Sequence, residues 1–281
     1  MSQIETLRQD FLSRVCADVI YLKNNSKPSM ADVASHQSVT IARALIHNLA
    51  HPVAAAPIPG QTAGQRLESI AKDFLERAFA LLQHIRPGRW HFSVHGDIAS
   101  FDQYRHLADL SRLVDQHPEL RIALGDYVIK PDIVVARYPV SDEQLSPDPA
   151  IRLVRPGGPP NRSPLRASNE SGLILHASIS CKWTIRSDRS QNARTEALNL
   201  IRNRKGHTPH IAVITGEPLP SRIASLALGT GDVDCVYHFA LPELVAAVNT
   251  AGDRTSNQLL DDMVRGRRLR DIADLPFDLA I

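Results

Sequence analysis

The chain has 281 residues, of which 43% are hydrophobic and 22% charged, a composition that is ordinary for a globular protein with one sizeable core. The formal net charge of +2 is too small to identify a nucleic-acid-binding protein by itself, and a neutral enzyme fits it equally well. No apolar run approaches the roughly 20 residues that span a bilayer, and the first thirty residues contain charges and no continuous apolar segment, so we expect a cytoplasmic protein that is neither membrane-bound nor secreted.

The N-terminal third of the chain is predicted to be helical. Apolar residues recur at helical spacing in Ile41–Leu49 and again in Leu67–Leu82, and a further helical stretch surrounds Tyr104–Val114. Residues 51–64, between the first two helices, contain three prolines and two glycines. We therefore expect this segment to be an irregular loop that projects toward a ligand.

The middle of the chain is predicted to contain a strand and then a long loop. Residues 127–135 have the β-branched content of a strand, which Pro131 interrupts just before Asp132. Residues 141–171 are rich in Pro, Gly, Ser and Arg. That composition favours a long surface loop or an insertion.

The segment from Leu173 to Thr184 alternates between apolar and polar residues, which is typical of a strand with one polar face. The residues of the polar face are His176, Ser178, Ser180, Lys182 and Thr184. From about residue 190 the spacing of apolar residues becomes helical, and Ser187 or Asp188 is suited to cap that helix. A strand is therefore expected to lead directly into a helix.

The C-terminal part is predicted to alternate between strands and helices. Residues 210–215 and 234–240 read as buried strands separated by a short helical stretch, and residues 242–248 as a helix. The order β, β, α, β, α, β, α favours an α/β fold with a mixed central β-sheet flanked by helices. We expect one domain over residues 1–281, with a helical part to about residue 120 and a catalytic α/β core from about residue 121.

Several of these residues suit hydrolysis of a phosphodiester bond, which requires a divalent cation held by carboxylates and a cationic donor near the attacking water. Asp132, at a Pro-Asp corner, is a candidate metal ligand, and Lys182 is the candidate cation. Ser180 stands two residues before Lys182, where the common nuclease arrangement has an acid. Glu196, roughly two turns into the following helix, can supply that carboxylate if the helix folds back along the strand. By spacing alone the pattern is weak, because a strand-end Asp is more often a turn cap.

The run from Arg186 to Arg189 follows this strand directly. Arginine can donate two hydrogen bonds to guanine O6 and N7, and aspartate can accept one from cytosine N4. The sequence Arg-Ser-Asp-Arg is therefore suited to read neighbouring G·C pairs in the major groove. A salt-bridged helix N-terminus is the more common use of such residues, so both interpretations stay open at this point.

Other residues able to bind metals or bases are expected to be structural. The three cysteines lie far apart with no CxxC pair, which argues against a zinc site and against a disulfide framework. His176 and His238 lie in apolar strands and are expected to be hydrogen-bonded core histidines. Trp183 is more typical of a core residue than of a base-stacking platform.

Two blocks of sequence carry a family resemblance, namely Lys130-Pro-Asp-Ile-Val-Val135 and His176-Ala-Ser-Ile-Ser-Cys-Lys-Trp-Thr-Ile-Arg-Ser-Asp-Arg189. The matches that extend them are Gln191–Arg194, Glu196, Asn199–Gly206, Pro209-His210, Pro59–Thr62, Leu226–Phe239 and Leu269–Leu279. With these blocks the sequence resembles restriction endonucleases of the NgoMIV type and, more distantly, the Cfr10I and SgrAI enzymes. The resemblance covers most of the chain and weakens in the first thirty residues and in residues 141–171.

The resemblance implies a restriction-endonuclease-like core in which a Ser-x-Lys…Glu pattern replaces the common nuclease motif. Asp132 and Glu196 are implied to bind or orient metal ions, with Mg²⁺ as the cofactor and two ions per active site. Lys182 is implied to position and activate the attacking water. Ser180 lies beside it, and the backbone carbonyl of Cys181 is implied to be a further metal ligand.

The resemblance also implies which residues read the DNA. Arg186, Asp188 and Arg189 match the cluster that reads CCGG, and Gln61 matches a minor-groove contact, where an amide can serve guanine N2 and purine N3.

Three further residues match family positions. Asp32 and Arg222 match the pair that reads an outer G·C pair, which extends the site to GCCGGC, although Ala34 replaces a polar residue near Asp32. Glu68 matches an additional acidic position of the active site, where a helical surface glutamate is the alternative interpretation.

The function implied by the resemblance is that of a type II restriction endonuclease that hydrolyses double-stranded DNA at GCCGGC before the first C and leaves 5′-phosphate ends. A palindrome is best read by a two-fold symmetric protein, so we expect at least a dimer. The family implies a homotetramer of two dimers and a cognate DNA methyltransferase in the same system.

Two alternatives remain from the residues alone. A structure-guided repair or recombination nuclease would share the catalytic residues but have no use for a G·C-reading cluster. A non-catalytic DNA-binding protein would need no carboxylates around Lys182.

Overall fold

The structure is a computed structural model of the chain that divides into two compact units. Unit 1 comprises Met1–Pro87, Ile179–Leu198 and His210–Ile281, and unit 2 comprises Gly88–Ser178 and Asn199–Pro209. The structure describes residues 1–23, 27–116, 119, 130–148, 150–169, 172–185, 187–229 and 231–281, without the side chains of 111, 115 and 187–190.

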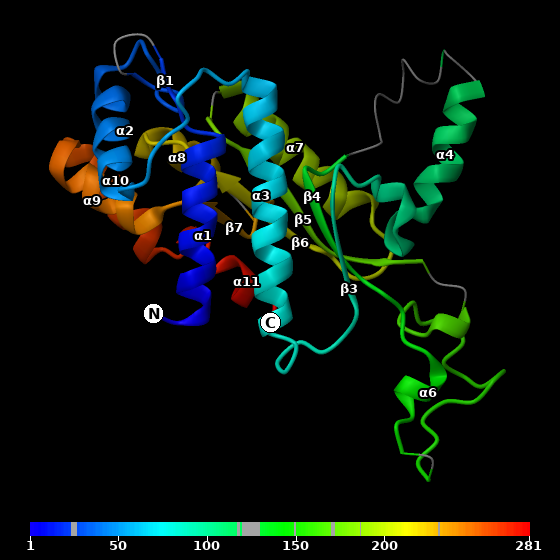
Figure 1. The fold of residues 1–281 in the computed structure, drawn as a ribbon. Helices are drawn as coiled ribbons and strands as arrows, with labels where there is room; N and C mark the ends of the chain where they lie inside the picture. The colour runs from blue at the N-terminus through cyan, green and yellow to red at the C-terminus, as the bar shows by residue number, and fades with distance from the viewer. Residues whose placement is uncertain are drawn as a thin grey trace. The chain divides into compact units, whose positions relative to one another are not determined.

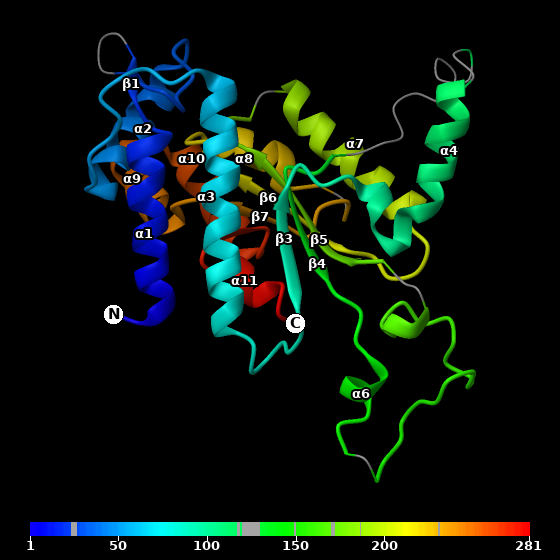
Figure 2. The same ribbon diagram turned by 45° about the vertical axis from the view of Figure 1, so that its right-hand side comes forward.

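Unit 1 begins with three long helices, which are α1 (Gln3–Asp18), α2 (His36–Leu49) and α3 (Gly60–Leu81). Helix α1 begins with a capping box, in which Ser2 and Glu5 satisfy each other's backbone N–H groups. Helices α1 and α3 lie side by side (Figures 1 and 2), and the rings of Phe11 and Phe74 meet there with centroids 5.4 Å apart. The helices predicted over 41–49 and 67–82 are confirmed.

The loop predicted over residues 51–64 is wrong in its last part, because α3 begins at Gly60. Pro59 is the N-cap residue of α3, and its carbonyl oxygen accepts the helical hydrogen bond from Ala63 at 2.9 Å. A proline just before a helix removes no donor that the helix needs, so this proline starts the helix and does not interrupt it.

The sheet strands of unit 1 lie in the order β5, β6, β7, β8. Their bounds are Ile174–Lys182 for β5, of which unit 1 contains residues 179–182, His210–Thr215 for β6, Cys235–His238 for β7 and Leu269–Asp271 for β8. β6 pairs with β7, and β7 with β8, in parallel. β6 and β7 are almost wholly buried, as parallel strands covered on both faces are. The strand predicted over residues 210–215 is confirmed, and the one over 234–240 is confirmed with a shorter span.

Helices connect and flank these strands. They are α7 (Ser187–Asn203), which continues into unit 2 after Leu198, α8 (Pro220–Ala227), α9 (Leu241–Ala251), α10 (Arg254–Arg265) and the short α11 (Leu275–Asp278). Helix α2 packs against α9, and α8 against α10. Helix α7 begins at Ser187, so both Ser187 and Asp188 lie in its first turn. A capping residue would have to lie just before the helix, so the predicted capping role is wrong. A small hairpin pairs β1 (Leu22–Lys23) with β2 (Lys27–Pro28).

In unit 2 the sheet strands lie in the order β3 (Trp90–Val94), β4 (Ile133–Arg137), β5, with residues 174–178 of β5 in this unit. β3 and β4 are antiparallel, with Phe92 opposite Val135. Together with the parallel strands of unit 1 this makes the sheet mixed, as predicted. The strand predicted over residues 127–135 begins only at Ile133, and residues 127–129 lie outside the described part of the chain. β3 was not predicted, although its residues Trp-His-Phe-Ser-Val alternate between apolar and polar; all five are half-buried.

Helix α4 (Arg105–Gln116), which confirms the predicted helical stretch, follows two short 3₁₀ turns, η2 (Ile98–Ser100) and η3 (Asp102–Tyr104). Gln103 is buried here, and its side-chain amide exchanges two hydrogen bonds with the backbone of Leu175, at 2.7 and 2.9 Å. The Tyr104 hydroxyl donates to the Leu200 carbonyl oxygen at 2.9 Å. These bonds anchor α4 on β5 and on the end of α7 within unit 2.

The predicted loop at residues 141–171 has internal order of its own. It contains α6 (Asp142–Leu145), which Ser141 and Gln144 cap, and the 3₁₀ turn η4 (Ala167–Asn169). Arg166 is buried and bonds both carboxylate oxygens of Asp142, at 2.6 and 2.5 Å. Among the residues that the structure describes, no helix is both long and apolar enough to cross a membrane.

Candidate active site

The end of β5 and the middle of α7 bring two of the predicted catalytic residues together in unit 1. The Ser180 hydroxyl donates a hydrogen bond of 3.1 Å to Oε2 of Glu196. Ser180 and Lys182 stand two residues apart on β5 and therefore share one face of the strand. All three side chains are partly exposed. Helix α7 thus folds back along β5, as the spacing required for Glu196 to replace the missing acid.

The polar face of β5 changes character along the strand. His176 and Ser178 are buried, each 6% exposed, whereas the strand opens to solvent from Ser180 onward. The His176 ring packs against Trp90, with centroids 4.8 Å apart, and is the core histidine that the sequence predicts. Within β5, only the part of the polar face from Ser180 to Lys182 is therefore available to a substrate.

His238 lies in the core, as expected, whereas Trp183 is only half-buried. His238 is fully buried, and its Nδ1 accepts a hydrogen bond of 3.1 Å from the Ala240 backbone N–H. Burial disfavours the charged imidazolium and lowers the pKa of His238 to about 4. The Trp183 ring packs against Phe239, with centroids 5.2 Å apart, so it is a packing residue.

Asp132 and Glu68 occupy different units. Asp132 directly precedes β4 in unit 2, where it is partly exposed and its carbonyl oxygen accepts from the His95 N–H at 3.1 Å. Glu68 lies on α3 in unit 1 and is only 8% exposed. The alternative interpretation of Glu68 as a surface residue is therefore wrong, because a helical surface glutamate would be largely hydrated.

The predicted metal ligands are all oxygen atoms, from the Asp132 and Glu196 carboxylates and the Cys181 carbonyl. Oxygen donors of this kind suit Mg²⁺, so the chemistry of the set fits the cation. Within the described ranges, no three or more His, Cys, Asp or Glu side chains gather closely enough to hold a metal ion. A set of two carboxylates and one backbone carbonyl would not form such a group.

The predicted DNA-reading residues are only partly within the described structure. Arg186 lies outside the described residues, and Asp188 and Arg189 lie in the first turn of α7 with their side chains outside the described ones. Gln61 is exposed in the first turn of α3.

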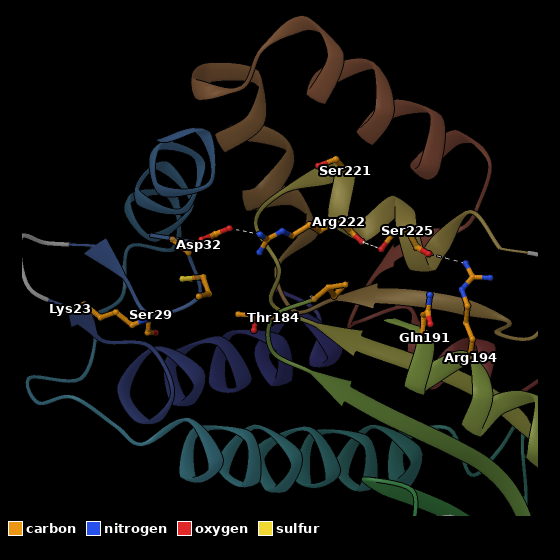
Figure 3. Close-up of a pocket in the computed structure, with 12 residues that line it drawn as sticks. Lys23, Ser29, Asp32, Thr184, Gln191, Arg194, Ser221, Arg222 and Ser225 are labelled. Carbon is orange, nitrogen blue, oxygen red and sulfur yellow. Dashed lines mark hydrogen bonds and ion pairs between the residues drawn. The ribbon is translucent and has the colours of Figure 1, made fainter. Parts of the chain in front are cut away.

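Asp32 and Arg222 are brought together across a cavity of about 950 Å³ in unit 1. Figure 3 shows the two side chains pointing toward each other, and they form an ion pair. The residues that line the same cavity include Lys23, Thr184, Gln191 and Arg194. The pair predicted to read the outer base pair therefore faces a space that is also bordered by the segment after β5.

Arg194 belongs to the basic cluster of the sequence but binds the protein itself. Its guanidinium donates to the carbonyl oxygens of Ser225 and Leu226, at 3.0 and 3.1 Å, and lies 3.5 Å from the buried carboxylate of Asp232. Arg194 therefore fastens α7 to α8 (Figure 3).

Sequence reasoning did not predict the role of residues 215–217, which begin with the last residue of β6 and bind the turn after β5. Its hydrogen bonds to that turn are Thr215 Oγ1 to the Lys182 carbonyl at 2.7 Å, Gly216 N–H to the Trp183 carbonyl at 3.2 Å, and Ile185 N–H to Glu217 Oε2 at 2.9 Å. The one available signal was an acidic residue directly after a buried, apolar strand, where a carboxylate would be unusual without polar partners.

Comparison with known proteins gives matches over nearly the whole chain. The family model of the NgoMIV restriction enzymes matches residues 11–281. The type II restriction enzyme NgoMIV of Neisseria gonorrhoeae is 45% identical over 270 residues, which cover 94% of this chain and 93% of that enzyme. Among solved structures, a complex of restriction endonuclease PspGI with substrate DNA aligns with a TM-score of 0.36 and 12% identity, over 78% of this chain and 60% of that one.

Proposed function

The chain belongs to the NgoMIV restriction enzyme family, and we propose that it is a Mg²⁺-dependent endonuclease that cuts double-stranded DNA at GCCGGC before the first C. As a type II restriction endonuclease it cleaves DNA at a specific sequence. The observation that carries the proposed active site is the Ser180–Glu196 hydrogen bond, which places a carboxylate of α7 against the strand that ends in Lys182.

In this proposal Asp132, Glu196 and the carbonyl of Cys181 hold two Mg²⁺ ions. Asp132 takes its role from the resemblance of its block to the family, and Glu196 from the same resemblance together with its contact to Ser180. When bound, divalent cations supply charge stabilisation to the phosphoryl group and to the departing 3′ oxygen. Glu68, buried on α3, supplies a further acidic group to the site.

The residues at the end of β5 have separate roles. Lys182 carries a compact positive charge with three donors, so it can hold the attacking water and the scissile phosphate in one geometry. Ser180 fixes the rotamer of Glu196 through its hydroxyl. The water oxygen loses a proton as it joins the phosphorus, the bond to the 3′ oxygen breaks, and that oxygen takes up a proton, which yields a 5′-phosphate and a 3′-hydroxyl.

Sequence recognition is assigned to residues that follow β5 in the sequence, to one residue in the first turn of α3 and to the pair that lines the cavity of unit 1. The proposed base contacts are Arg186, Asp188 and Arg189 for CCGG, Gln61 in the minor groove, and Asp32 with Arg222 for the outer G·C pair. The ion pair between Asp32 and Arg222 supports the last assignment, since an arginine and an aspartate held together match the donors and acceptors of one G·C pair.

The palindrome requires two-fold symmetry, so we propose a homodimer that reads one site and a homotetramer of two such dimers. We further propose that both units work as one endonuclease domain, residues 1–281, and that a cognate DNA methyltransferase protects the host.

The test is digestion of a plasmid of known sequence with Mg²⁺, followed by sequencing of the ends. We expect cleavage at GCCGGC before the first C by the wild type, and a loss of at least about a hundredfold in Lys182→Ala. Binding of the same DNA in Ca²⁺ should be retained by the variant. Lys72→Ala is the matched control, because Lys72 is bonded to Asp73 and Glu76 on α3 and should leave cleavage unchanged.

Undiminished cleavage by Lys182→Ala would overturn the proposed active site. Cleavage of DNA that lacks CCGG would overturn the proposed specificity and favour a repair nuclease, and binding without any Mg²⁺-dependent cleavage would refute a nuclease altogether.

A further inference from the structure

Glu217 lies at the centre of the contacts between the turn after β5 and the segment before α8. Its side chain is completely buried. Oε2 accepts the Ile185 N–H at 2.9 Å, and Oε1 accepts the Leu219 N–H at 3.2 Å. One carboxyl group therefore binds the backbone on both sides of the gap between the two segments.

The same carboxyl group also faces a residue of the proposed recognition pair. Nη1 of Arg222 lies 3.9 Å from Oε2 of Glu217, and its Nη2 is paired with Asp32 on the opposite side. Arg222 is thus held between two acids, one that lines the cavity and one buried behind it. Figure 3 shows the Arg222 side chain directed at Asp32.

The turn that Glu217 binds is short and connects a residue proposed for cleavage with one proposed for base recognition. Residues 183–185 are all that separate Lys182 from Arg186 in the sequence. Two further hydrogen bonds from Thr215 and Gly216 fix the carbonyl groups of Lys182 and Trp183. An added Cβ at Gly216 would lie 2.3 Å from the Trp183 ring, so the two segments approach as closely as a glycine permits.

We propose that Glu217 is a positioning residue of the endonuclease, whose carboxyl group sets the place of the turn after Lys182 and of the Arg222 guanidinium together. This inference rests on the proposed function. Glu217 is too buried to touch DNA and acts through its partners. A carboxyl group in this position costs desolvation, which its two backbone N–H donors and Arg222 offset only in part.

The proposal predicts a loss of discrimination that a purely structural residue would not cause. Without Glu217, Arg222 keeps Asp32 as its one remaining ion-pair partner among the described residues and can move, so cleavage should become less dependent on the outer base pair. We expect the ratio of the cleavage rate at the preferred outer pair to that at the next best to fall about tenfold in Glu217→Gln. The rate at the preferred site should fall as well.

The experiment measures single-turnover cleavage of four DNAs that contain CCGG flanked by each palindromic outer pair. It uses the full-length wild type, Glu217→Gln and Glu217→Asp, which keeps the carboxyl group but shortens the side chain by one methylene group. The ratio of Glu217→Asp should therefore lie between those of Glu217→Gln and wild type. Glu243→Gln is the control, since Glu243 is another partly buried carboxyl group of unit 1 and bonds Arg8. The control should lower stability and leave the ratio unchanged.

A double-mutant cycle tests whether Glu217 affects recognition of the outer base pair through Arg222. If Glu217 acts on the outer pair through Arg222, then Glu217→Gln in an Arg222→Ala background should not change the ratio further. An additive loss in the double variant would overturn the link to Arg222.

Three results would overturn the inference. These are an unchanged ratio in Glu217→Gln, the same loss of ratio in Glu243→Gln, and, if Glu217→Gln does not fold, a wild-type ratio in Glu217→Asp. If the wild type itself cuts none of the four DNAs, the proposed function fails and not this inference alone.

Discussion

Replacing Glu217 by glutamine should change how the stability of the protein depends on pH. Burial raises the pKa of Glu217 from its ordinary value of 4.5 to about 7, against the smaller opposing effects of the Ile185 and Leu219 N–H groups and of Arg222, and with a small contribution from Asp32 in the same direction as burial. The folded chain therefore keeps this proton up to about pH 7, whereas the unfolded chain releases it near pH 4.5. The free energy of unfolding must fall as the pH rises through this window.

The size of the effect follows from the two pKa values. Each pKa unit corresponds to about 1.4 kcal/mol, so between pH 5 and pH 8.5 the wild type should lose about 2.5 kcal/mol relative to Glu217→Gln, given the pKa of about 7. His238 has the opposite slope, because its pKa is lowered to about 4 and the unfolded chain takes up that proton first as the pH falls. The two slopes oppose each other between about pH 4.5 and 6.5, so only the difference between variant and wild type isolates Glu217.

The assay is urea unfolding followed by tryptophan fluorescence at pH 5, 7 and 8.5, at one fixed protein concentration because an oligomer's stability depends on it. Glu243→Gln is again the control. Arg8 holds the pKa of Glu243 below its ordinary value despite burial, so its titration lies below this pH range and the difference from wild type should stay constant. If the difference between wild type and Glu217→Gln is also constant from pH 5 to 8.5, the assignment of a raised pKa to Glu217 is refuted.

Three further predictions concern single contacts. Ser180→Ala should slow cleavage by roughly tenfold, less than Lys182→Ala, because it removes one hydrogen bond to a charged group; a rate equal to wild type would show that the bond does not position the carboxylate. Gly216→Ala should lower the free energy of unfolding by about 1–3 kcal/mol, because its Cβ would overlap a neighbouring indole ring, whereas Gly60→Ala, with open space around it, should not; equal effects in urea unfolding would contradict this. Arg8→Ala should cost about 3–5 kcal/mol, because it leaves two partly buried carboxylates without their cation, and a loss below 1 kcal/mol would argue against the ion-pair cluster.

The sequence predicted best the elements whose pattern is local. The alternation from Leu173 to Thr184 gives β5 almost to the residue, and the apolar run 210–215 coincides with β6. β8 was missed because three residues, one of them the partly exposed Arg270, are too few to show a period. Element boundaries near prolines were also wrong, as at α3, because a proline is compatible both with a loop and with the start of a helix.

In the candidate site too, contacts between residues near in the sequence were predictable and contacts between distant segments were not. The contact between Ser180 and Glu196 was foreseeable, since a strand that leads directly into a helix leaves few ways for the helix to return. The pairing of Asp32 with Arg222 joins residues 190 positions apart, and only the resemblance to a family suggested it. No period or motif in one sequence encodes such a contact, because it depends on how distant segments pack.

Glu217, in the role proposed for it, shows why a positioning residue is not found by motif analysis. A motif records the groups that touch the substrate, and the residues proposed for that role stand at the exposed end of β5, whereas Glu217 is buried and binds backbone atoms. Backbone N–H groups are present at every position except proline, so the partner of a buried carboxyl group leaves no mark in the sequence. The buried acid itself can be recognised in the sequence. Glu217 comes two residues after the end of β6, a strand of six residues of which five are buried, and a carboxyl group there must either be neutralised or be held by several donors. In a restriction endonuclease such a residue deserves mutation together with the metal ligands, because an error of position of about 1 Å near the reacting phosphate can cost as much activity as the loss of a ligand.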